Sequence, residues 1–187
     1  MKLTTTLNKI RACNPCASGW RTLIKSLGDD FDHETEINLL TILDSNGVAD
    51  MLWTLRATLQ DSKRTASHLA IEFAEQALPI FEQRRPDDPR PRKAIKAARD
   101  YLAGTTSLEG LRKARAAAYA AYDAAAAAYA AAYAADAAYA AADAADAAYA
   151  AYVAAAYAAY AADAAYTSSG ERGREKQAEI ICSILGH

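Results

Sequence analysis

Residues 114–166 read ARAAAYAAYDAAAAAYAAAYAADAAYAAADAADAAYAAYVAAAYAAYAADAAY, and this stretch decides the fold. About seven in ten of its residues are Ala, and it holds ten of the chain's eleven tyrosines. It contains no Gly, no Pro and, after Arg115, no basic residue. Ala has the highest helix propensity because it loses no side-chain entropy in a helix. The stretch therefore predicts helix, and we call residues 114–166 the Ala/Tyr tract.

The length and spacing of the Ala/Tyr tract bear on the number of helices in it. A single helix would be about 90 Å long, whereas a globule of 187 residues is only about 40 Å across. The Tyr and Asp positions recur about every 3.4 residues, whereas a helix has 3.6 residues per turn, so the stripe of these side chains turns gradually around a straight helix. Because Asp is a good N-cap residue, a new helix can begin at an Asp within the tract. We therefore favour antiparallel helices with a break between Ala140 and Asp146 over one long helix.

The Tyr and Asp side chains of the Ala/Tyr tract are compatible with two roles. Ala-lined seams let helices approach closely, while Tyr rings cover the seam margins and their hydroxyls reach water or Asp. Tyr also supplies large, rigid contact area at protein interfaces, and carboxylates suit a basic, nucleic-acid-handling partner. Both roles stay open. The candidate partner-binding residues are Asp123, Tyr133, Asp136, Tyr139, Asp143, Asp146 and Tyr149.

The rest of the chain reads as shorter amphipathic helices. We expect them at 4–11, from a Ser18 cap to Gly28, from Asp32 or His33 to Asn46, and at 48–59, 62–83, 92–103 and 171–185. Thr106 and Glu109 form a capping box that begins the Ala/Tyr helix. The predicted fold is an all-α helical bundle with long, closely packed Ala/Tyr-rich helices. A small N-terminal helical subdomain at 1–60 precedes the Ala/Tyr-rich bundle at 61–187.

Charge is uneven along the chain. The net charge of −2 gives no overall field for nucleic acid or membrane, but residues 84–115 hold ten Lys or Arg against four Asp or Glu. The candidate phosphate-binding residues are Arg84, Arg85, Arg90, Arg92, Lys93 and Lys96. No aromatic residue lies among them, and Asp87 and Asp88 weaken their field. The pattern favours ion pairs with acidic residues of the Ala/Tyr helices over phosphate binding.

The chain contains cysteines and histidines, but their spacing matches no catalytic motif. Cys13 and Cys16 have the spacing of a redox pair or of half a zinc site, but no strand is predicted before them. The other thiol and imidazole groups, which form no second ligand pair, are Cys182, His33, His68 and His187. We read the cysteines as buried or incidental reduced thiols and His68 as a structural histidine. We expect no catalytic residue, metal or cofactor.

The hydropathy of the chain bears on the cellular location of the protein. The N-terminal residues form no apolar run of the kind that a secretory signal needs. The Ala/Tyr tract is long enough to span a membrane but carries Asp at intervals. We therefore expect a cytoplasmic protein without a membrane partner.

Residues 68–95 read HLAIEFAEQALPIFEQRRPDDPRPRKAI, and Tyr101-Leu-Ala-Gly and the Ala/Tyr tract follow them. This order resembles the Imm-5-like family of bacterial and phage immunity proteins, over about residues 65–166. Ala12–Trp20 also resembles the start of small proteins encoded in phages and prophages. The resemblance implies a protein-binding, non-enzymatic inhibitor of a toxin. If the gene is carried by a phage, we expect the target to be a host defence effector, as for an anti-CRISPR protein. The alternatives are a nucleic-acid-associated protein using residues 84–99 and a structural or oligomerisation protein.

Overall fold

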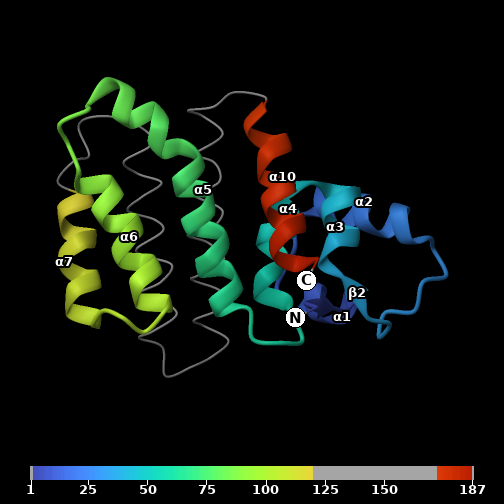
Figure 1. The fold of residues 1–187 in the computed structure, drawn as a ribbon. Coiled ribbons are helices and arrows are strands. Elements are labelled where there is room, and N and C mark those ends of the chain that lie inside the picture. Colours follow the sequence, from blue (N-terminus) through green and yellow to red (C-terminus); the bar gives the residue numbers. More distant parts are fainter. Residues whose placement is uncertain (1, 120–171, 187) are drawn as a thin grey trace.

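The computed structural model describes residues 2–119 and 172–186, which are mostly helical (Figure 1). The predicted all-α class is confirmed. The two strands in the described residues form only a short antiparallel ladder, with Thr4 opposite Asn38 and Thr5 opposite Ile37. The elements are β1 (Thr4–Thr5), α1 (Leu7–Ala12), α2 (Ala17–Leu27), β2 (Ile37–Asn38), α3 (Leu39–Asn46), α4 (Val48–Thr54), the 3-10 turn η1 (Leu55–Ala57), α5 (Lys63–Arg84), α6 (Arg90–Leu102), α7 (Leu108–Tyr119) and α10 (Arg172–Leu185). The predicted break between Ala140 and Asp146 lies outside the described residues.

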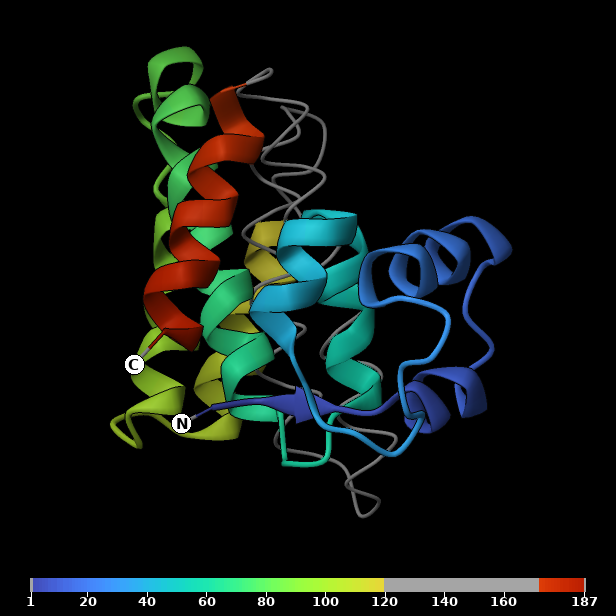
Figure 2. The same ribbon diagram turned by 90° about the vertical axis from the view of Figure 1, so that its right-hand side faces the viewer.

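The helices follow one another across the molecule in a simple spatial order. In Figure 1, α7, α6, α5 and α10 stand in that order and α3 lies beyond α10, while α4 contacts both α3 and α10. Figure 2 shows α10 in red beside α3 in cyan, with α2 in blue on the far side. The helix predicted at 171–185 packs against α5, α3 and α4, and Ile181 and Leu185 on α10 are buried.

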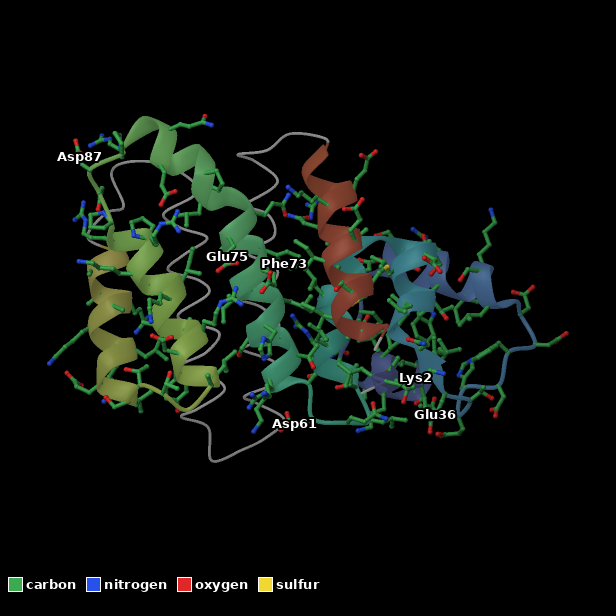
Figure 3. All side chains as sticks on the ribbon, in the orientation of Figure 1. Lys2, Glu36, Asp61, Phe73, Glu75 and Asp87 are labelled. Carbon is green, nitrogen blue, oxygen red and sulfur yellow. The ribbon has the colours of Figure 1, made fainter. Side chains whose placement is uncertain are left out.

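One hydrophobic cluster joins the buried side chains of the described helices. Phe73 on α5 is fully buried, as are Leu7 on α1 and Leu111 on α7. In Figure 3, Phe73 lies on the side of α5 that faces α10. Removing this apolar surface from water is the main favourable contribution to folding. The cluster includes residues on both sides of position 60, and the division into 1–60 and 61–187 stays a prediction.

The first residues form a strand where helix was predicted. Thr4 and Thr5 are extended, and helix α1 begins only at Leu7. Thr6 caps that helix, since its hydroxyl oxygen accepts a hydrogen bond from the Lys9 amide at 3.2 Å. Three consecutive Thr residues favour extended structure because β-branched side chains are restricted in helices. The Thr5 hydroxyl donates to the Ala57 carbonyl at 2.5 Å and thereby ties the strand to η1.

Two further helices start at residues other than those predicted. The cap of α2 is Cys16, whose sulfur accepts from the Gly19 amide at 3.3 Å, and Ser18 lies inside the helix. Helix α3 begins at Leu39 and not near Asp32, because Asn38 accepts from the Leu40 amide at 3.0 Å. Both predictions chose an acceptable capping residue type, but another acceptor stands at the position where the helical backbone begins.

The start of α6 and the cap of α7 also differ from the predictions. The helix predicted at 92–103 begins earlier, since α6 starts at Arg90 and holds Pro91 in its first turn. Proline is tolerated there because the first-turn amides have no partner within the helix. The hydroxyl of Ser107, and not that of Thr106, accepts from the Gly110 amide at 3.2 Å at the start of α7.

Candidate functional site

The predicted partner-binding face lies outside the described residues. Its members are Asp123, Tyr133, Asp136, Tyr139, Asp143, Asp146 and Tyr149, all between positions 120 and 171. Their role therefore stays a prediction. The described residues do include the candidate phosphate-binding segment, the cysteines, His68 and a pocket that the sequence did not indicate.

Arginines of the basic segment are held by carboxylates around the start of α6. Arg90 binds Asp88 with two nitrogens, at 2.8 Å from Nε and 2.6 Å from Nη2. Arg92 binds Glu82 on α5 in the same two-point manner, at 2.7 and 2.6 Å. The hydrogen bond from Arg90 lowers the pKa of Asp88, and the bond to Glu82 raises the pKa of Arg92. Such bidentate pairs are the strongest form of the Arg–carboxylate contact.

Further along α6 the pairing continues. Lys96 contacts Asp100 one turn later at 2.5 Å, and Arg99 contacts Glu72 at 3.0 Å and Glu75 at 2.7 Å. Figure 3 shows Glu75 on α5. Burial alone would lower the pKa of Arg99, but the hydrogen bonds and charges of Glu75 and Glu72 outweigh it and raise that pKa. The contacts of Arg99 join α6 to α5, whereas the Lys96–Asp100 pair lies within α6.

The basic segment forms ion pairs among the described residues, with partners on α5, on α6 and in the loop between them. The predicted pairing with acidic residues of the Ala/Tyr helices lies outside the described residues and stays a prediction. Arg85 and Lys93 are exposed, and Arg84 is the last residue of α5. Carboxylates within hydrogen-bond distance offset the attraction of these cations for phosphate. Phosphate binding by residues 84–96 stays a prediction.

The two N-terminal cysteines flank the turn between α1 and α2. Cys13 is half-buried and Cys16 is exposed, and both are free thiols. The hydrogen bonds from the Ser18 hydroxyl and the Gly19 amide lower the pKa of the Cys16 thiol. The sequence analysis left the cysteines as buried or incidental thiols, and Cys16 is not buried. Across the described ranges, no three side chains of His, Cys, Asp or Glu gather in a metal-binding cluster.

His68 lies half-buried on α5. Burial lowers the pKa of its ring, and the charge of Arg64 acts in the same direction. The ring is therefore neutral over a wider pH range than that of an exposed histidine. This environment agrees with a structural histidine.

A pocket of about 80 Å³ lies between α2, α3, α4 and the turn before α2. Trp20 and Trp53 line it and are half-buried, and Cys16 and Asp50 also line it. The two tryptophans lie on different helices, and no local pattern in the sequence indicates that they meet around a hollow. The available signal was Asp50, an ionisable residue one turn before Trp53 on the same helix.

The comparisons with known proteins point to one family. No curated protein and no solved structure matches the chain. No helix of the described segments is long and apolar enough to cross a membrane. A family model described as "Imm-5 like putative immunity protein" matches residues 56–184, which is more than half of the chain and includes the stretch on which the resemblance rests. The chain therefore belongs to the Imm-5 like putative immunity protein family.

Proposed function

We propose that this protein is a non-enzymatic inhibitor that binds another protein and neutralises it. The observation that carries the proposal is the family match over residues 56–184. The target is a toxin or, if the gene is carried by a phage, a host defence effector of the kind that anti-CRISPR proteins inhibit. The inhibitor acts by covering a surface of its target, so its own contribution is shape and charge.

Charge complementarity supports a basic partner. The Ala/Tyr tract carries five Asp residues and no basic residue after Arg115. On α6, in contrast, carboxylates of α5 and α6 pair with Arg92, Lys96 and Arg99. Opposite charges on two partners speed their encounter and disfavour wrong partners. We propose that the acidic face of the Ala/Tyr tract meets the target.

The function is tested by capture followed by neutralisation. The full chain, carrying a tag, is used to capture proteins from its native host, and each captured protein is then produced in a test bacterium with and without the full chain. We expect one captured protein to arrest growth alone and to lose that effect when the chain is present. Captured proteins that are all harmless, or equally harmful with the chain, would overturn the proposal.

The binding face is tested by a charge-reversal variant with a matched control. The face variant is Asp136→Lys, Asp143→Lys and Asp146→Lys, and the control reverses the exposed Asp29, Asp30 and Asp87, so both change the net charge equally. We expect the face variant to bind the target at least tenfold more weakly and the control to bind as the natural chain does. Equal affinities would place the face elsewhere.

A nucleic-acid-binding function is tested with the same protein. Binding through free cations would strengthen steeply as the salt concentration falls. Arg90, Arg92 and Lys96 already face carboxylates. We therefore expect no binding to DNA or RNA at about 20 mM salt, where the Debye length exceeds 10 Å and charges are only weakly screened. Salt-dependent binding that disappears in an Arg85→Gln and Lys93→Gln variant would contradict this expectation.

A further inference from the structure

The pocket between α2, α3 and α4 lies in a part of the chain that the family match does not cover. All of its lining residues fall between Ile10 and Thr54, whereas the match begins at residue 56. Its walls are mainly indole and aliphatic side chains, and both tryptophans of the chain are among them. Ligand pockets typically combine such apolar walls with a few polar groups. The pocket is therefore a candidate binding site.

Each indole is held in place from outside the pocket. The Arg56 guanidinium carbon lies 4.9 Å from the centroid of the Trp53 ring. The ring of His33 meets Trp20 edge to face, with 6.4 Å between the centroids. Neither Arg56 nor His33 lines the pocket. Walls that are ordered before binding lose little conformational entropy when a ligand enters.

Asp50 supplies the charge. Among the described residues that line the pocket, it is the one acidic or basic side chain, and it is half-buried. Its Oδ2 accepts a hydrogen bond from Asn46 Nδ2 at 2.8 Å, and the same nitrogen donates to the Gly19 carbonyl at 2.8 Å. Asp50 forms no ion pair within residues 2–119 and 172–186. A fixed carboxylate beside apolar walls favours a ligand that carries a positive charge.

The volume limits the shape of that ligand. A pocket of about 80 Å³ is about half the size of the roughly 150 Å³ apolar cavity that holds benzene. A pocket of this size favours a slender group such as an unbranched alkyl chain over an aromatic ring. Lysine carries four methylenes that end in a compact ammonium group, and indole faces attract cations. Arginine ends in a wider planar group.

We propose that this pocket binds a lysine side chain of the protein partner. The alkyl stem lies between Trp20 and Trp53, and the ammonium group pairs with Asp50. Long cationic side chains commonly bury their stem and leave the charged end near water. The inference rests on the proposed inhibitor function, for which it names one contact and the chemistry that contact recognises.

The test uses two small probes that differ in charge. The full chain, labelled with ¹⁵N, is titrated with Nα-acetyl-lysine-N-methylamide and with the norleucine counterpart, which has the same four side-chain carbons without the amine. The readout is the pair of indole N–H resonances, since the chain has only two tryptophans and both line the pocket. We expect the lysine probe to bind in roughly the millimolar range, as one side chain can, and at least fivefold more tightly than norleucine.

An isosteric variant tests the role of the carboxylate. Asp50→Asn keeps the side-chain shape and removes the charge, so it is expected to abolish the difference between the two probes. Asp44→Asn is the matched control, because Asp44 is exposed on α3 and does not line the pocket. Equal binding of the two probes to the natural chain, or an unchanged preference in Asp50→Asn, would show an uncharged occupant and overturn the proposal. Indole resonances that do not move with either probe would also overturn it.

A second readout does not depend on the folding of a variant. Cys16 lines the pocket and has an exposed thiol, while Cys182 is exposed on α10. We expect the lysine probe to slow alkylation of Cys16 and not of Cys182 in the natural chain, and an unchanged rate at Cys16 would contradict the proposal. These titrations require no toxin. Failure to capture a target would therefore affect the proposed function, whereas failure of the titrations would affect the pocket alone.

Discussion

Replacing Phe73 by Ala tests whether the Phe73 side chain of α5 lies in the hydrophobic cluster. The Phe73 side chain is fully buried. A buried aromatic side chain removes about 150–250 Å² from water, which at about 25 cal/mol per Å² corresponds to roughly 4–6 kcal/mol. Ala retains part of this, and measured Phe→Ala changes in cores cost about 3–5 kcal/mol. We expect the free energy of unfolding to fall by about 4 kcal/mol.

The measurement is urea unfolding followed by two signals. Circular dichroism at 222 nm reports helix, and tryptophan fluorescence reports the region of Trp20 and Trp53. With a slope of about 2 kcal/mol per molar urea, the midpoint should fall by about 2 M. The control is Gln83→Ala, since Gln83 is exposed near the end of the same helix and such a surface change stays within about 0.5 kcal/mol.

Two outcomes of the unfolding measurements test the packing of the fold. A loss below about 1.5 kcal/mol for Phe73→Ala, well under the range for a buried aromatic side chain, would refute the placement of this side chain in the core. The two signals also test the predicted division at position 60. Coincident transitions indicate one cooperative unit, whereas fluorescence and circular dichroism curves that separate indicate an N-terminal subdomain that unfolds on its own.

The remaining predictions concern charge and thiol chemistry. Arg99→Gln should destabilise the fold by at most about 1 kcal/mol, because its contacts with glutamates are about half exposed, and the loss should shrink in 1 M salt when thermal unfolding is measured. His68 has a folded-state pKa below the usual 6.5, so the unfolded chain binds more protons and stability should fall as the pH drops below about 6.5. That pH dependence should weaken in His68→Gln, and an equal slope in both proteins would refute it. Because its pKa is lowered, Cys16 should react faster with iodoacetamide at pH 7 than the same residue in Ser18→Ala, as followed by peptide mass spectrometry, and equal rates would contradict the cause assigned.

Local features were predictable from sequence. Gly28 was predicted at a helix end and lies there with a positive φ angle of 93°. Gly47 and Gly104 also follow helices and have φ angles of 83° and 74°. Positive φ costs glycine little because it has no Cβ. Helix caps were less predictable, because neighbouring residues such as Thr106 and Ser107 are both suitable and small differences in backbone position decide which one is used.

The sequence alone determined the all-α class and the family, because both depend on features encoded locally. These features are helix propensity, glycine at chain reversals and the order of motifs in residues 68–95. The tertiary structure alone decided that Thr4 and Thr5 pair with residues more than thirty positions away and that the cations of α6 meet the carboxylates of α5. It also brought Trp20, Asp50 and Trp53 to one pocket. The physical reason is that these contacts join segments distant in sequence, and no local preference specifies which distant side chains will meet when the helices pack.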